Sequence, residues 1–214
     1  CVVLMAEGPA FCAGHDLREL TAARVQTDGG RGFFARTMAA CSAVMRAVAE
    51  HPVPVIAAVE GVATAAGAQL VASCDLALAA SDARFATPGV NIGLFCSTPM
   101  VALSRNISHK HAMQMLLTGE LIDADTALRF GLINEHVPAA ELEARTTALA
   151  RQIASKSPLT LAMGKQAFYR QAELPLDEAY AYTRGVMVAN LQARDAQEGI
   201  NAFIDKRPPT WCGQ

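Results

Sequence analysis

The chain has 214 residues, which predicts one or two domains, and it is 52% hydrophobic and 18% charged. This composition excludes a disordered chain, which combines low hydrophobicity with a high net charge. No apolar run approaches the roughly 18 residues of a membrane span, so we expect no membrane partner. A net charge of −2 without a basic block excludes a sequence-independent nucleic-acid surface.

The cysteines are scattered along the chain and form no CxxC pair; they are Cys1, Cys12, Cys41, Cys74, Cys96 and Cys212. A chain of this length needs no disulfide, so we expect reduced, mostly buried thiols. The expected compartment is therefore a reducing one, the cytoplasm, or the mitochondrial matrix if the chain is eukaryotic.

Strands and helices alternate in the first half of the sequence. Short apolar runs predict buried strands at Val2–Met5, Val55–Val59 and Asp75–Ala79. Apolar residues at helical spacing predict a helix from Phe34 to Val48, and a further helix is expected at Ala66–Ser73. Strand, helix and strand in this order indicate parallel pairing. Because Cys1 opens directly into a strand, we expect an N-terminal portion of the fold to be missing.

The second half of the sequence is predicted to be mostly helical. The expected helices are His111–Leu117, Asp123–Phe130, Ala140–Ser157, Leu159–Arg170 and Leu176–Ile204. Asp123 is a candidate N-cap, and Gly119 and Gly131 are candidate helix stops. We therefore predict an α/β domain over residues 1–138 and a helical region over residues 139–214.

Two glycine-containing turns carry the first chemical signal, because each leads from a predicted strand into a predicted helix. They are Phe11–Leu17 and Glu60–Leu70. The first turn of a helix has unpaired backbone N–H groups, and small residues let a ligand approach that backbone. Side by side, two such turns could direct two N–H groups at one carbonyl oxygen. Tight packing alone is the alternative explanation for the small residues.

These segments resemble the crotonase superfamily of enoyl-CoA hydratases and isomerases. Gly93–Pro99 is most similar to a divergent branch of the superfamily. The resemblance as a whole rests on Phe11–Leu17, Pro52–Leu70 with Cys74–Leu76, Phe85–Gly93, Leu117–Gly119, Ala127–Ile133 and Lys206–Pro208. It implies an α/β fold, a crotonase-like β-β-α spiral of sheets, with residues 139–214 as a helical C-terminal trimerisation region. It also implies a homotrimer or a dimer of trimers.

The resemblance places the functional residues as follows. The backbone N–H groups of the oxyanion hole fall on His15 and Ala66, and the strip that contacts acyl-CoA includes Ala13, Asp16 and Leu17. The two catalytic glutamates of the hydratases fall on Gln69 and Gly89. An amide cannot accept a proton at neutral pH, and glycine has no side chain, so glutamate-pair hydration is disfavoured here.

Several side chains have two interpretations each. Asp16 is interpreted as a helix cap rather than a base, and His15 as a backbone donor rather than a base. Cys96 is a buried small hydrophobe or a nucleophile, and Asn91 lines the pocket or hydrogen-bonds a loop. Lys206 either meets the phosphates of CoA or complements a helix C-terminus.

The sequence therefore predicts an acyl-CoA thioester-binding protein of the enoyl-CoA hydratase/isomerase type, a lyase or isomerase of fatty acid metabolism. We expect no metal and no cofactor beyond the coenzyme A of the substrate. The alternatives are a non-catalytic acyl-CoA-binding or assembly subunit, and another crotonase reaction such as thioester hydrolysis or decarboxylation.

Overall fold

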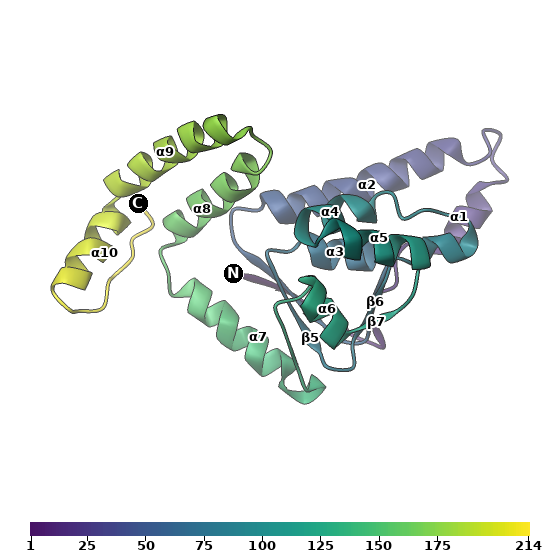
Figure 1. The fold of residues 1–214 in the computed structure, drawn as a ribbon, viewed down its shortest axis with the longest axis horizontal. Coiled ribbons are helices and arrows are strands. Elements are labelled where there is room, and N and C mark those ends of the chain that lie inside the picture. Colours follow the sequence, from purple (N-terminus) through teal and green to yellow (C-terminus); the bar gives the residue numbers. More distant parts are fainter. The chain divides into compact units, whose positions relative to one another are not determined.

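The computed structural model describes residues 1–214, which form two compact units. The core unit comprises Val3–Ala49 and Val55–Thr147. The C-terminal unit comprises Ala148–Gln214 together with Cys1–Val2 and Glu50–Pro54. Figure 1 shows the strands within the core unit, and the helices of the C-terminal unit in green to yellow. The two units meet between Thr147 and Ala148, inside the helix α7 (Ala139–Ala154). The domain boundary expected from sequence at 138/139 stays a prediction.

Eight short strands form two four-stranded sheets. The first sheet has the order β1-β3-β5-β8 and contains β1 (Val2–Leu4), β3 (Val55–Val59), β5 (Leu76–Ala80) and β8 (Glu135–Val137). The second has the order β2-β4-β6-β7 and contains β2 (Ala10–Cys12), β4 (Val62–Thr64), β6 (Arg84–Ala86) and β7 (Ile122–Asp123).

The centre of the first sheet is the buried core. All five residues of β3 are buried, and β5 pairs with it in parallel, with Ala57 opposite Ala77. Parallel strands that are covered on both faces need continuous apolar runs rather than alternation, which these strands have. The predicted strands and their parallel pairing are confirmed. The second sheet was not predicted, because its strands of two or three residues are too short to show a periodicity.

Seven α-helices and one 3-10 helix connect these strands or follow them. They are α1 (Leu17–Ala23), α2 (Arg31–Glu50), α3 (Ala66–Ser73), the 3-10 helix η1 (Pro88–Ile92), α4 (Pro99–Asn106), α5 (His109–Thr118), α6 (Ala124–Phe130) and α7 (Ala139–Ala154). The predicted cap is confirmed, because the Asp123 carboxylate accepts from the Thr126 N–H at 2.9 Å. Gly119 and Gly131 end α5 and α6 in the left-handed conformation, with φ of 64° and 82°.

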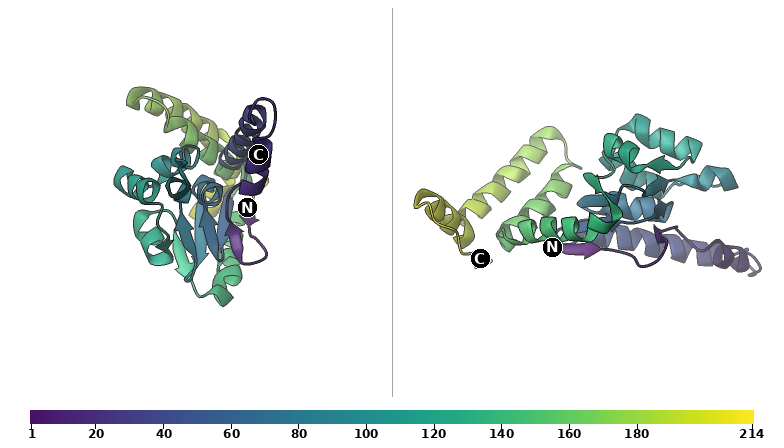
Figure 2. Two further views of the ribbon diagram at one scale, coloured as in Figure 1. Left: turned by 90° about the vertical axis from the view of Figure 1, so that its right-hand side faces the viewer. Right: turned by 90° about the horizontal axis from the view of Figure 1, so that it is seen from below.

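Three helices build the C-terminal unit: α8 (Pro158–Gln171), α9 (Leu176–Gln192) and α10 (Arg194–Ile204). The prediction of one helix over Leu176–Ile204 is wrong, because Ala193 is extended at ψ 147° and separates two helices. The right-hand view of Figure 2 shows α9 and α10 as separate helices. No helix of either unit combines the length and apolarity that crossing a bilayer requires.

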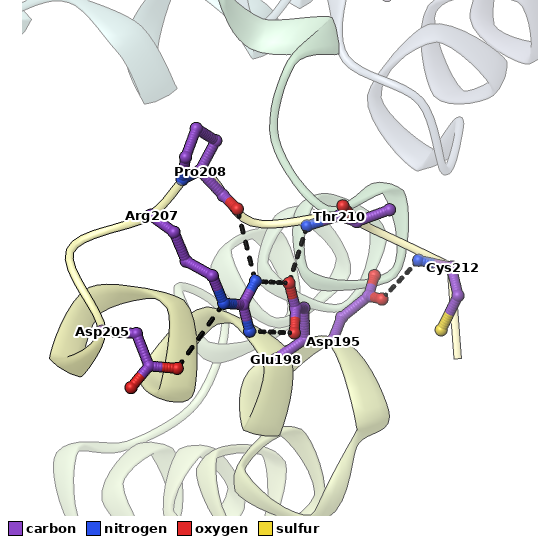
Figure 3. A network of polar contacts seen from close by, with 7 residues as sticks. All are labelled: Asp195, Glu198, Asp205, Arg207, Pro208, Thr210 and Cys212. Carbon is purple, nitrogen blue, oxygen red and sulfur yellow. Dashed lines mark hydrogen bonds and ion pairs between the residues drawn. The ribbon is translucent and has the colours of Figure 1, made fainter.

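A polar network around α10 gives a reason for this break (Figure 3). The Asp195 side chain, 1% exposed, accepts from the Ser157 hydroxyl at 2.6 Å and from the Cys212 N–H at 2.7 Å. These hydrogen bonds hold the pKa of Asp195 below its usual value, with the Ser157 hydroxyl as the largest cause. The carboxylate thus ties the start of α8 and the C-terminal tail to the first turn of α10.

A second part of the network joins α10 to the segment that follows it. The Arg207 guanidinium donates to both oxygens of Glu198, at 2.7 and 2.9 Å, and the Thr210 N–H donates at 2.9 Å (Figure 3). The Arg207 hydrogen bond is the largest cause that lowers the pKa of Glu198 to about 2. Such bidentate pairs fix direction as well as distance.

The cysteines differ in exposure from the prediction. Only Cys74 and Cys96 are buried, while Cys12 and Cys41 are half-buried and the other two are exposed. The expectation of mostly buried thiols is therefore wrong, because the two exposed cysteines lie near the chain ends and the two half-buried ones lie beside the site described below.

Candidate functional site

Three parallel strands of the second sheet end at one edge. Ala10 of β2 lies opposite Val62 of β4, and Thr64 of β4 lies opposite Ala86 of β6. The segments that follow these strands therefore leave the sheet on the same side. Ligands of α/β proteins bind outside the carboxyl ends of parallel strands, so this edge is the candidate site.

The turn after β2 contacts the turn after β4. Gly14 has φ +100°, and a Cβ placed on it would lie 3.0 Å from the Ala65 Cβ and 3.6 Å from the Ala66 nitrogen. The Thr64 hydroxyl also donates to the Ala13 carbonyl at 3.2 Å. The side-by-side placement of the two turns, predicted from sequence as a possibility, is present in the structure.

The turn after β4 is built on two unusual backbone positions. Ala65 has φ 52° and ψ −115°, a conformation that L-residues rarely adopt, and its N–H donates to the Ala86 carbonyl at 3.0 Å. A Cβ on Gly67 would overlap the carbonyl oxygen of Cys12, so only glycine lets α3 approach β2 this closely. Sequence reasoning missed Ala65, because alanine gives no sign of a positive φ.

Two backbone N–H groups are available at these turns. Ala66 is the first residue of α3, so its N–H has no acceptor in the helix, and the N–H of His15 has no acceptor in the chain. Asp16, by contrast, is occupied: its carboxylate caps α1 by accepting from the Arg18 N–H at 2.7 Å. The cap interpretation of Asp16 is confirmed, and the N–H groups of His15 and Ala66 are left without a partner in the chain.

Gln69 lies one helical turn after Ala66 and is 4% exposed. Its side-chain oxygen Oε1 accepts from the Cys41 thiol of α2, with 3.8 Å between the sulfur and the oxygen. Burial raises the pKa of the Cys41 thiol, which therefore stays protonated at neutral pH. Sequence reasoning missed Cys41 as a site residue and saw only its place in the apolar stripe of a helix.

The space beside the Gly89 Cα is filled by the segment that follows it in the chain. The Leu94 N–H donates to the Gly89 carbonyl at 2.9 Å, so the segment after η1 folds back over it. A Cβ on Gly89 would lie 2.7 Å from the Leu94 carbonyl oxygen and 2.9 Å from the Cys96 sulfur. Any side chain at this position would require the segment to move. Cys96, 8% exposed, is packed into the space that a side chain at position 89 would use.

The remaining predicted site residues lie as follows. The Asn91 side chain donates to the Gly119 carbonyl at 3.4 Å, which is the loop hydrogen bond rather than a free pocket group. Ala13 and Leu17 are exposed beside the first turn. Lys206 follows α10 in the C-terminal unit, and its contact with CoA phosphates stays a prediction.

Comparisons with known proteins find a matching family and similar solved structures. Residues 1–214 match the family described as enoyl-CoA hydratase/isomerase. The human enoyl-CoA hydratase domain-containing protein 3, mitochondrial, is 52% identical over 210 residues, which cover 98% of this chain and 68% of that protein. Its crystal structure superposes with a TM-score of 0.91 and covers 98% of this chain and 81% of the other.

A bacterial structure is similarly close. The crystal structure of an enoyl-CoA hydratase from Mycobacterium smegmatis has a TM-score of 0.92 at 48% identity, covering 98% of this chain and 80% of that one. These neighbours confirm the predicted α/β crotonase-like fold and the predicted resemblance to a divergent branch.

Proposed function

The chain belongs to the enoyl-CoA hydratase/isomerase family, and we propose that it binds acyl-CoA thioesters and polarises their carbonyl group. In this proposal the backbone N–H groups of His15 and Ala66 form an oxyanion hole. The observation that supports it most is the contact between the two turns, which brings unpaired N–H groups to the carboxyl edge of one sheet. Removing one donor of such a hole typically costs about 2.7–4 kcal/mol of transition-state stabilisation.

The proton chemistry of this site differs from that of a pair of glutamates. Gln69 offers an amide, which cannot accept a proton at neutral pH, and Gly89 offers no side chain. A second candidate function follows from this: a thioester reaction that needs the oxyanion hole alone, such as hydrolysis or decarboxylation. A non-catalytic acyl-CoA-binding subunit is the third.

We also propose that the chain forms a homotrimer or a dimer of trimers through its C-terminal unit. Large apolar side chains are exposed there, among them Leu176 at 72%, Tyr180 at 69% and Phe203 at 85%. Exposed apolar side chains of this size support a protein–protein contact on these helices. The vertebrate relatives are named mitochondrial, so the mitochondrial matrix is the proposed compartment for a eukaryotic source, in place of the cytoplasm.

The test removes one donor without changing a side chain of the pocket. An amide-to-ester exchange that replaces Ala66 by lactic acid deletes the N–H at the first position of α3 and keeps the methyl group. We expect the affinity for crotonyl-CoA, measured by calorimetry, to fall at least tenfold. The same exchange at Ala139, the exposed first position of α7, is the matched control and should leave binding unchanged.

Turnover is measured on the same samples. Loss of the enoyl absorbance of crotonyl-CoA at high protein concentration, compared with heat-inactivated protein, reports hydration. Binding without turnover supports the second or third candidate function. Failure of the wild-type protein to bind crotonyl-CoA would overturn the proposal, as would equal binding by the Ala66 ester variant with an unchanged Tm.

A further inference from the structure

Three side chains from separate elements of the core unit form one line of hydrogen bonds. The Ser81 hydroxyl oxygen lies 3.1 Å from Nδ1 of His136, and Nε2 of His136 lies 3.0 Å from the Asp125 carboxylate. Ser81 follows β5, His136 lies in β8, and Asp125 lies in the first turn of α6. A serine, a histidine and a carboxylate in this order are the parts of an activated nucleophile.

The pairing of β5 with β8 produces this alignment. The two strands are parallel, and Ala79 of β5 lies opposite His136 of β8. Side chains two positions apart leave a strand on the same face, and Ser81 is two residues after Ala79. The backbone N–H of Ser81 also donates to the Val137 carbonyl at 2.8 Å, which holds the serine against β8.

The carboxylate determines which ring nitrogen of His136 carries the proton. An ionised carboxylate can only accept a hydrogen bond, so Nε2 donates to Asp125. In the neutral ring Nδ1 is then an acceptor, and the Ser81 hydroxyl donates to it. The hydroxyl proton of the serine is therefore already directed at a base.

The turn that carries Ser81 also offers a backbone donor. The Ala83 N–H donates to the Ala80 carbonyl at 2.9 Å, so Ser81 and Asp82 are the central residues of a tight turn. The Asp82 N–H has no acceptor in the chain. In hydrolases whose nucleophile stands on a sharp turn after a strand, the N–H of the next residue stabilises the negative oxygen of the intermediate.

A guanidinium group adds positive charge beside this turn. Arg84 donates from Nη1 to the carbonyl oxygens of Asp82 and Ala83, at 2.9 Å each. This charge offsets the Asp82 carboxylate, which would otherwise oppose a second negative charge next to the nucleophile.

We propose that Ser81 is a nucleophile that hydrolyses small carboxylic esters with a good leaving group. Ser81 and His136 are the catalytic residues, and Asp125 is the positioning residue that holds the ring. The nucleophile follows a strand of the first sheet, whereas the proposed oxyanion hole of the acyl-CoA site follows strands of the second sheet. This esterase site is therefore separate from the proposed function and does not depend on it.

The reaction needs water as its only co-reactant. The Ser81 oxygen attacks the carbonyl carbon of the ester, its proton passes to Nδ1 of His136, and an electron pair moves to the carbonyl oxygen. The bond to the leaving oxygen then breaks, and the alcohol or phenol departs with the proton from Nδ1. Water attacks the acyl group on Ser81 in the same way, which releases the carboxylic acid and restores the serine.

The exposure of the three side chains sets the size of the substrate and the weight of each role. Ser81 is exposed, so a small ester reaches it directly from solvent. The side chain of His136 is 22% exposed and that of Asp125 is 80% exposed. Exposed pairs of this kind are weak, so we expect Asp125 to contribute less than the two catalytic residues.

The first experiment labels the nucleophile directly. Diisopropyl fluorophosphate reacts with an activated serine, whose oxygen bonds to phosphorus while fluoride and the hydroxyl proton leave as HF. The full protein is treated at pH 7, and peptide mass spectrometry locates the label. We expect one label per chain, on Ser81. Ser155 is the internal control and should stay unlabelled, because it is exposed but donates to the Gln152 carbonyl instead of a histidine.

The second experiment measures hydrolysis of p-nitrophenyl acetate by the same protein. Thiols are alkylated beforehand, because exposed cysteines also react with this ester. Ser81→Ala and His136→Gln should each lower the rate by about tenfold or more, since each removes one partner of the proton transfer. Ser155→Ala and His109→Gln change exposed residues of the same types elsewhere and should keep the rate. The Tm of each variant is measured alongside.

Two further variants test the positioning role of Asp125. Asp125→Ala should lower the rate by less than the catalytic variants do, because the exposed carboxylate is screened by water. Asp125→Glu, which keeps the carboxylate, should restore part of this loss. Equal rates of these two variants would overturn the positioning role.

The other contrary outcomes concern the nucleophile, the base and the acyl-CoA site. A Ser81 that stays unlabelled overturns the proposal, as does a hydrolysis rate that survives Ser81→Ala. A rate that survives His136→Gln overturns the role of His136 as the base. Failure of the wild-type protein to bind crotonyl-CoA would overturn the proposed function alone, because labelling of Ser81 does not involve the acyl-CoA site.

Discussion

The candidate site and the C-terminal network use different parts of the chain to reach a defined geometry. At the site, backbone N–H groups and small residues such as Gly67 and Gly89 determine which atoms can approach one another. Around α10, ionised side chains fix the geometry instead, because Glu198 and Asp195 each accept hydrogen bonds from several donors. The first arrangement is sensitive to added volume and indifferent to charge. The second is sensitive to pH.

The largest effect is expected from adding one methyl group between α3 and β2. Gly67→Ala places a Cβ onto the carbonyl oxygen of Cys12, and backbone atoms cannot move aside as a side chain can. We expect a loss of about 3 kcal/mol of unfolding free energy, measured by urea denaturation.

The matched control is the same substitution in the C-terminal unit. Gly164 lies within α8 and has no atom within 4 Å of its Cβ position. Gly164→Ala should therefore stabilise the protein by about 0.5–1 kcal/mol, because glycine is unfavourable inside helices. Equal effects of the two substitutions would show that the approach of α3 to β2 does not depend on glycine.

A smaller effect is expected at Gly89. Gly89→Ala should cost about 1–3 kcal/mol of unfolding free energy, since the segment with the Leu94 carbonyl must shift. Adding Cys96→Ala removes the contact with sulfur but leaves the contact with the carbonyl, so the double variant should recover only part of the loss. Full recovery would identify the sulfur as the sole obstacle. Acyl-CoA binding measured on the same variants reports whether the shift reaches the site.

The smallest effect is expected from the charged network, and it depends on pH. The pKa of Glu198 falls from 4.5 to about 2 on folding, so its contribution to stability is complete above pH 4.5 and is lost as the pH falls toward 2. Glu198→Gln should lower Tm at pH 7 and bring the Tm of the variant and of the wild type together as the pH approaches 2. Arg207→Met should behave in the same way. A Tm difference that is constant from pH 7 to pH 2 would contradict this assignment.

The sequence predicted the elements that local pattern alone determines. The helix at Ala66–Ser73 and the strand at Val55–Val59 have the predicted bounds, because apolar runs and small-residue turns mark them. The break at Ala193 could not be predicted, since no proline or glycine stands there and the cause is Asp195, which is held by residues near the chain end.

The site was predictable in its backbone and not in its side-chain contacts. Residues around Gly14 and Ala66 belong to turns that sequence pattern and family resemblance both indicate. The contact of Cys41 with Gln69 joins residues 28 positions apart, and the closure of Gly89 depends on a segment that folds back. Neither contact has a signature in residue spacing, because each arises only when separate elements pack.

The closure of Gly89 also limits what can be engineered at that position. An acidic side chain introduced there would meet the Leu94 carbonyl and the Cys96 sulfur before it could reach a substrate. Adding a carboxylate at position 89 would therefore need accompanying changes in the segment from Leu94 to Cys96. The packing of this short segment makes position 89 resistant to any single substitution.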